Sequence, residues 1–134
     1  MAEASPYAYA LVRIVPVIER EEFVNAGVIL FARTRDFLGC ALHLDEPLVR
    51  ALAPDADLPW LARHLEAFRA VCEGDPAAGP VARLPAHERF HWLTAPRSTI
   101  IQPGPVHAGV AVSPAAALAE LFAARVRRPA TAAT

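Results

Sequence analysis

Three runs of aliphatic, aromatic and β-branched residues open the chain and predict three strands. They cover residues 7–15, 23–32 and 37–44. The first run stops at Pro16, which has no N–H to donate to a sheet. Only the polar stretch 33–36 separates the second run from the third, so we expect these two strands to form an antiparallel hairpin.

Two helices are predicted after the strands. Asp45, followed by Pro47 in the first turn, indicates a short helix that ends near Pro54. Asp57 is the expected cap of a longer helix, which Gly74 ends. The apolar residues of this helix recur at helical spacing and define one buried face: Leu58, Leu61, Leu65, Phe68 and Cys72.

The last third of the chain predicts two more helices and two short strands. Two helical turns are expected at residues 85–93, and strands at 99–101 and 106–112. An Ala-rich helix follows over 114–127, with Ser113 as its cap. Strands first, then helices, then a strand and a helix are typical of an α+β domain. We therefore expect an antiparallel β-sheet with helices packed mainly on one face.

Composition fits one compact domain with a substantial core, because 54% of the 134 residues are hydrophobic and 20% are charged. We expect a single domain over residues 1–128 and a disordered tail over 129–134. Glu3 stands where a signal peptide would carry basic residues, and no apolar run approaches the roughly 18 residues that span a bilayer. The prediction is a cytoplasmic protein that does not bind a membrane.

The charge pattern excludes some functions and disfavours others. The formal net charge is −1 and the 13 basic residues, all Arg, are scattered along the chain, so binding to nucleic acid is not favoured. Without a lysine, neither a P-loop nor a kinase lysine can be present. Cys40 and Cys72 lack the partner spacing of a zinc site and are expected to be core residues.

His87, Glu88 and His91 form the pattern H-E-x-x-H. On a helix this spacing places both imidazoles on one face, and the carboxylate can act as base to a zinc-bound water. Two ligands are too few for a catalytic zinc, and the third would have to be His43, His64, His107 or Glu120. The alternative is a surface helix with Phe90 and either Trp92 or Leu93 partly buried. We favour this alternative, so no metal or other cofactor is expected.

The second apolar run contains two unusual residues, Asn25 and Gly27. A buried amide without a hydrogen bond costs about 1 to 3 kcal/mol. Asn25 is therefore expected to hold a neighbouring loop or a ligand. Arg13 poses a related choice, because a charge within the first strand lies either on a solvent face or paired in a cleft.

Arg97 and Ser98 stand at the entrance to the short strand at 99–101. A guanidinium with neighbouring hydroxyls can bind a carboxylate or a phosphate. The alternative is an ion pair between Arg97 and Glu21 or Glu22, which would fix the loop, and we favour this structural pairing.

Four segments together resemble one known family. They are residues 9–16 (YALVRIVP), 20–31 (REEFVNAGVILF), 89–93 (RFHWL) and 95–99 (APRST). In this ordered combination the chain resembles the DUF3037 family of small bacterial proteins, over residues 7–122. The family has no established activity, so the resemblance supplies a relationship without a mechanism.

The resemblance has two further implications. It implies a partner, a HipA-like kinase-fold protein, for which this chain would be an accessory subunit. It also implies that the histidine at position 91 belongs to the family pattern whereas that at position 87 does not, which weakens the zinc hypothesis. The candidate site that results is one polar cluster: Arg13, Glu22, Asn25, Arg97 and Ser98.

The function that these observations favour is that of a non-catalytic binding module or accessory subunit, which acts through a protein partner or through self-association. Two alternatives stay open. One is a small metal-dependent hydrolase that uses His87, Glu88 and His91. The other is an anion-binding enzyme built around Arg97, Ser98 and Asn25.

Overall fold

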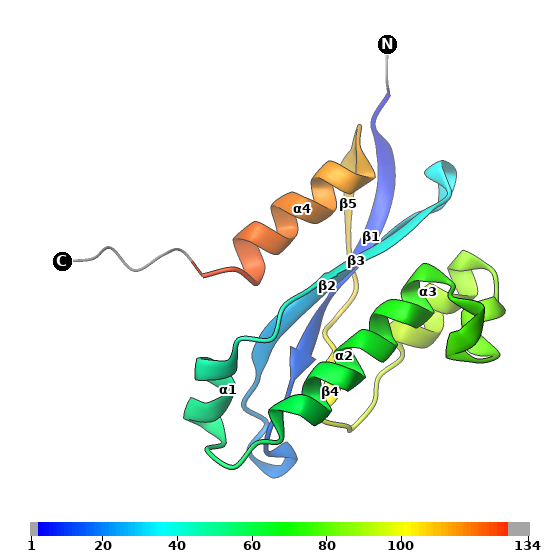
Figure 1. Ribbon diagram of the computed structural model, residues 1–134. Coiled ribbons are helices and arrows are strands. Elements are labelled where there is room, and N and C mark those ends of the chain that lie inside the picture. Colours follow the sequence, from blue (N-terminus) through cyan, green and yellow to red (C-terminus); the bar gives the residue numbers. More distant parts are fainter. Residues whose placement is uncertain (1–2, 129–134) are drawn as a thin grey trace.

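An antiparallel five-stranded sheet organises residues 3–128, the part of the chain that this computed structural model describes (Figure 1). β1 is the central strand. It pairs with β2 on one side, and β2 pairs with β3; on the other side β4 and β5 both pair with β1, one after the other along its length. The strands are β1 (Ser5–Ile14), β2 (Val24–Ala32), β3 (Phe37–Leu42), β4 (Ile101–Pro103) and β5 (His107–Ala111).

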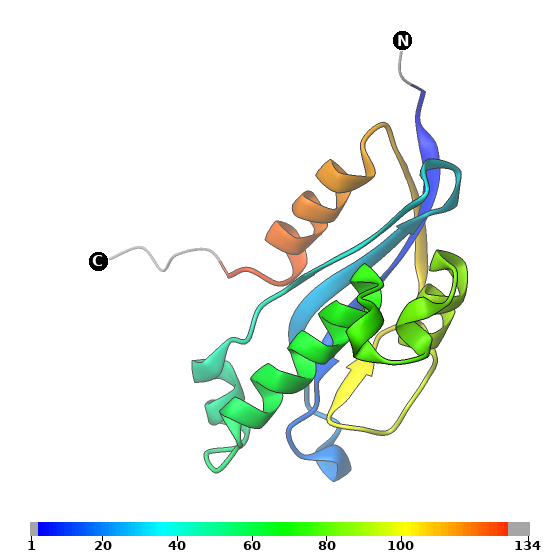
Figure 2. The same ribbon diagram turned by 45° about the vertical axis from the view of Figure 1, so that its right-hand side comes forward.

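Helices cover both faces of this sheet unequally. The described residues form α1 (Glu46–Leu52), α2 (Leu58–Glu73), α3 (Ala86–Thr94) and α4 (Pro114–Arg125). The first three pack into one core on one face, and α4 lies alone on the opposite face (Figures 1 and 2). The expected α+β fold with helices mainly on one face is therefore confirmed. The predicted tail at 129–134 lies outside the described residues.

The helix boundaries follow the predicted capping residues. The carboxylates of Asp45 and Asp57 accept hydrogen bonds from backbone N–H groups in the first turns of α1 and α2, at 3.2 and 3.1 Å. The Ser113 hydroxyl does the same for α4 at 3.2 Å. Gly74 ends α2 with a φ of 73°, a left-handed conformation that glycine adopts without a steric penalty.

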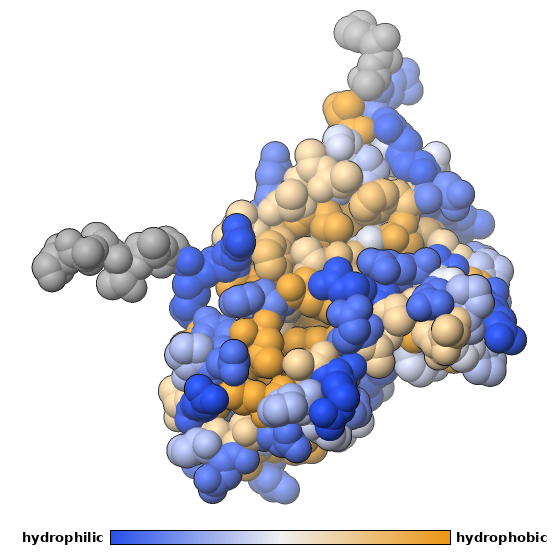
Figure 3. Space-filling view, viewed as in Figure 1, coloured by the Kyte–Doolittle hydropathy of each residue, from blue (hydrophilic) through white to orange (hydrophobic). Residues whose placement is uncertain are grey.

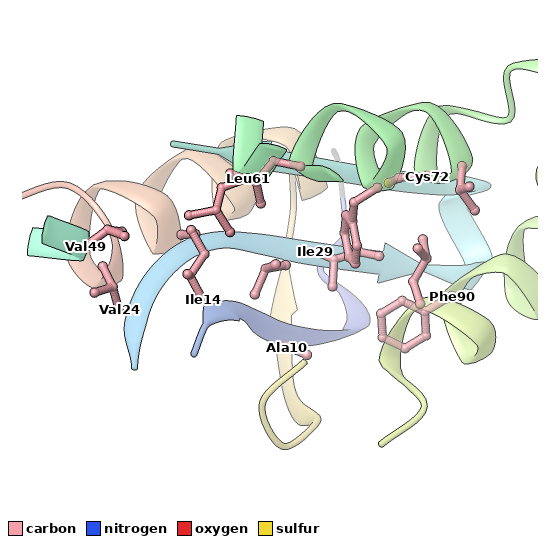
Figure 4. Close-up of a cluster of buried hydrophobic side chains, with 14 of the residues drawn as sticks. Ala10, Ile14, Val24, Ile29, Val49, Leu61, Cys72 and Phe90 are labelled. Atoms are coloured by element: carbon pink, nitrogen blue, oxygen red, sulfur yellow. The ribbon is translucent and has the colours of Figure 1, made fainter. Parts of the chain in front are cut away.

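Successive side chains of each strand point to opposite faces of the sheet, and each face has its own hydrophobic core. Ala10, Val12 and Ile14 of β1 point to α2 and α3 and belong to the larger core, which Figure 4 shows. Tyr7 and Tyr9 point the other way, to α4, where Leu30, Ala32 and Ala117 are the buried residues of a smaller core. The surface between α4 and α2, where β3 borders the sheet, is largely apolar and framed by hydrophilic side chains (Figure 3).

A β-bulge interrupts the pairing of β1 with β2. Val12 pairs with Gly27 and Arg13 pairs with Asn25, so Ala26 is an extra residue on β2. A Cβ on Gly27 would lie 2.4 Å from Leu42 Cδ2 and 2.7 Å from the carbonyl oxygen of Ala41. The Asn-x-Gly pattern thus marks the bulge and a point where β3 leaves no room for a side chain on β2.

Most predicted elements agree with the structure, and the differences lie at their ends. The third strand ends at Leu42, two residues before the predicted end. The strand predicted at 99–101 is shifted by two residues and runs from Ile101 to Pro103. The Thr99 hydroxyl donates to the Ile101 carbonyl at 2.7 Å, and this bond turns the chain just before the strand. Within residues 3–128, no helix combines the length and the apolar character that a membrane crossing requires.

Candidate functional site

A large open cleft lies between α2 and the segment 92–101 that leads from α3 into β4. Its volume is about 850 Å³. Apolar side chains dominate its lining, among them Phe68 and Val71 of α2 and Ile100 and Ile101 opposite. We call this feature the α2 cleft. Concave, mostly apolar clefts with a few polar groups are the usual form of binding sites.

Two stacked pairs of side chains stand at the border of the α2 cleft. Trp60 and His64 are one helical turn apart, with ring centroids 3.7 Å apart, and His64 Nδ1 lies 2.9 Å from the Trp60 carbonyl oxygen. Across the cleft the Arg97 guanidinium lies 4.9 Å from the centre of the Trp92 ring. Trp92 is 44% exposed, so its ring is available to a ligand.

The backbone holds Arg97 in place. Its guanidinium donates to the carbonyl oxygen of Trp92 and, at 3.3 Å from Nε, to that of Ala95. These bonds explain why the predicted ion pair between Arg97 and Glu21 or Glu22 is wrong. Glu22 instead pairs with Arg20 at 2.7 Å, and this hydrogen bond lowers the pKa of the Glu22 carboxyl.

The acidic side chains around the α2 cleft have partners within the protein, whereas two of its arginines have no carboxylate partner among residues 3–128. Glu66 pairs with Arg69 at 3.4 Å, and the Asp75 carboxylate accepts the N–H of Ala77 at 3.0 Å. Within residues 3–128, neither Arg63 nor Arg97 has a carboxylate partner, although both line the cleft. The cleft therefore offers two guanidinium groups to an anionic ligand.

Arg13 and Asn25 lie together, but on the other face of the sheet. They are cross-strand partners on the side of α4, and the Arg13 guanidinium stacks 4.1 Å from the centre of the Phe23 ring. Asn25 Nδ2 donates to the Arg125 carbonyl at 3.2 Å, near the end of α4. As expected, this amide holds a neighbouring segment. Among the described residues, Arg13 Nε and Asn25 Oδ1 are buried without a hydrogen-bond partner.

The predicted polar cluster thus divides into separate parts. Arg13 and Asn25 meet near α4, whereas Arg97 lines the cleft on the opposite side of the sheet. Glu22 belongs to an exposed ion pair, and Ser98 is exposed in the loop after α3. An anion site that combines Arg97 with Asn25 is therefore not formed in this arrangement.

His87, Glu88 and His91 are all exposed on α3, whereas Phe90 and Leu93 turn inward. Within the described residues, no group of three or more His, Cys, Asp or Glu side chains is arranged to hold a metal ion. The two cysteines lie together in the larger core. The neighbouring Cys40 thiol and burial together raise the pKa of the Cys72 thiol.

We expect the purified protein to hold far less than one zinc per chain after chelation and reloading, because the exposed histidines of α3 have no third ligand among residues 3–128. Metal analysis of the protein and of a His91→Ala variant tests this expectation. Stoichiometric zinc that disappears in the variant would show that the H-E-x-x-H pattern is a metal site.

Sequence reasoning missed the α2 cleft. No pattern in the sequence marks Trp60 as a site residue, and His64 is a candidate there only as a third zinc ligand. The one local signal was the spacing of Trp60 and His64, four residues apart on a helix, which places them side by side. Contacts between α2 and residues 92–101, which close the cleft, depend on the tertiary fold.

The fold and the cleft define a class: a small α+β domain with an open antiparallel sheet and a large cleft beside α2. The family described as "Protein of unknown function (DUF3037)" matches residues 9–126. The chain belongs to this family. No curated protein and no solved structure matches it.

Proposed function

We propose that this protein is a non-catalytic binding module, an accessory subunit that holds an acidic and apolar segment of a partner protein in the α2 cleft. The α2 cleft is the observation that carries this proposal. Its apolar floor is suited to aliphatic or aromatic anchors, and its size, about 850 Å³, accommodates several side chains.

The arginines of the α2 cleft that lack a carboxylate partner among residues 3–128 favour a partner segment that carries acidic residues. Glu66 and Asp75 already have partners of their own, whereas Arg63 and Arg97 have no carboxylate within residues 3–128. A segment with one or two acidic residues next to its apolar anchor would supply the missing carboxylates. A kinase-fold partner of the HipA type, which the family resemblance implies, is the first protein in which to look for such a segment.

The stacked pair of Trp92 and Arg97 gives the cleft a rigid wall. Because the guanidinium is fixed by two backbone carbonyls, little conformational entropy is lost when a ligand packs against it. Tryptophan and arginine are the residue types that most often dominate the binding energy of interfaces. We therefore expect this pair to be central to recognition.

Replacing Trp92 by alanine should weaken binding at least about tenfold, because the largest exposed apolar contact of the cleft is removed. The measurement is fluorescence anisotropy with peptides that combine two acidic residues and a leucine or aromatic anchor, compared with peptides in which amides replace the acids. The acidic peptides should bind more tightly, and salt should reduce the difference.

The chain offers a matched control on the other face of the sheet. Phe23 is also exposed and also stacks with an arginine, Arg13. Its replacement by alanine should leave peptide binding unchanged. Equal affinity for acidic and amide peptides, or an equal loss in the Phe23→Ala and Trp92→Ala variants, would contradict the proposed site.

A further inference from the structure

The strand β5 borders the sheet and leaves one of its edges unpaired. It pairs with β1 along its whole length, and no strand within residues 3–128 pairs with its other side. β5 and β2 pair with opposite sides of β1, so β5 lies at the border of the sheet that is farther from β3. A strand in this position can accept a further strand through its backbone N–H and C=O groups.

Hydrogen bonds of β1 show which residues of β5 direct their backbone N–H and C=O groups to the open edge. The Leu11 carbonyl accepts the N–H of Gly104 at 2.7 Å, and the Val15 N–H donates to the Ile100 carbonyl at 2.6 Å. Odd-numbered residues of β1 therefore direct their backbone groups to the side of β4 and β5. Gly109 and His107, which pair with Tyr7 and Tyr9, therefore direct their own backbone groups to β1.

The intervening residues of β5, Ala108 and Val110, consequently point their backbone groups outward. Val110 is 70% exposed, and two more valines flank the strand at even positions, Val106 at 51% and Val112 at 48%. The open edge thus combines free hydrogen-bonding groups with a row of exposed valines.

None of the devices that normally prevent edge pairing interrupts this strand. Residues 98–119 contain no Asp, Glu, Lys or Arg, and β5 itself contains no proline and no bulge. The other border strand, β3, differs because α2 and α4 pack on its two faces and leave its side chains half-buried. The side chains of β5 are therefore the more exposed of the two sets.

We propose that two copies of this chain pair antiparallel through β5, with the two-fold axis at Gly109. This register aligns Val106 with Val112 of the second copy, and Ala108 with Val110 of the second copy. Both strands present the same outward groups, so the contact is self-complementary. In a two-fold dimer, a charged residue at this edge would lie close to the same residue of the second copy and repel it. β5 contains no Asp, Glu, Lys or Arg, so this repulsion is absent.

Gly109 suits the centre of such an axis. A Cβ at this position would lie 2.5 Å from Cζ and Oη of Tyr7, so glycine leaves room for the Tyr7 ring to lie across the strand there. It also leaves the centre of the contact without a side chain, which allows the two backbones to come together.

Sedimentation velocity over a range from about 5 to about 500 µM protein tests the proposal. The protein is expected to shift from monomer to dimer within this range, because a contact between two short edges is small and therefore weak. Val110→Lys should weaken dimerisation at least about tenfold, since the dimer contains the substitution twice. Val112→Lys serves as a second variant in case the first does not fold.

Ile18→Lys is the matched control, because Ile18 is also an exposed aliphatic residue but lies in the turn between β1 and β2. It should dimerise like the unmodified protein. A protein that stays monomeric at every concentration overturns the proposal. So does a dimer that persists in both lysine variants, because such a dimer uses another surface. Peptide binding in the α2 cleft is measured separately and does not depend on β5.

Discussion

Replacing Gly27 by alanine is expected to lower the free energy of unfolding by about 3 kcal/mol, although only one methyl group is added. The new Cβ would lie 2.4 Å from Leu42 Cδ2 and 2.7 Å from the Ala41 carbonyl oxygen. The second contact is with backbone, so it can be relieved only if β3 moves away from β2. Such a movement would weaken the pairing at the bulge.

Urea unfolding followed by circular dichroism measures this effect. Gly39→Ala is the matched control, because it adds the same methyl group to the neighbouring strand. There the closest atoms belong to the side chains of Phe37, at 2.9 Å, and Leu118, at 3.2 Å, and side chains can adjust. A Gly27→Ala variant as stable as Gly39→Ala would show that β3 does not approach β2 as described.

The second large effect is expected at Phe90, where alanine should cost about 3 to 5 kcal/mol. Phe90 is 5% exposed and stacks on Phe31 of β2, with ring centroids 5.4 Å apart. Its removal would leave a cavity between α3 and the sheet. Urea unfolding again gives the change in free energy.

His91 provides the comparison for this experiment, because it is the next residue of α3 and is exposed. His91→Ala should change stability by no more than about 0.5 kcal/mol. The pair of variants separates the two interpretations of this helix, a surface helix anchored by Phe90 and a site built on its histidines. A large loss of stability at His91 with little change at Phe90 would contradict the described packing.

Local signals predicted the elements well because their causes are local. Asp45, Asp57 and Ser113 cap helices through hydrogen bonds to residues three positions away or fewer, and Gly74 ends α2 through its own φ angle. The strands follow from runs of residues that favour a pleated, buried surface. The sequence therefore indicated the fold class and placed the ends of the strands and α-helices to within about two residues.

The candidate site was less predictable because its contacts are long-range. The sequence does not show that backbone carbonyls satisfy Arg97, so an ion pair with Glu22 was the natural but wrong expectation. A period of two places Arg13 on one face of β1, yet only the bulge and the position of α4 show that Asn25 faces it there. The α2 cleft likewise exists only once α2 and residues 92–101 are brought together.

The unequal filling of the two sides of the sheet has a consequence for how the molecule opens. Fifteen buried residues form the core under α1, α2 and α3, whereas three form the one under α4. A fluctuation that lifts α4 therefore exposes these three buried residues and the partly buried side chains around them, and it breaks the hydrogen bond from Asn25 to Arg125, whereas the larger core stays closed. The protein consists of one tightly held layer and one loosely held layer, and partial unfolding begins at the second.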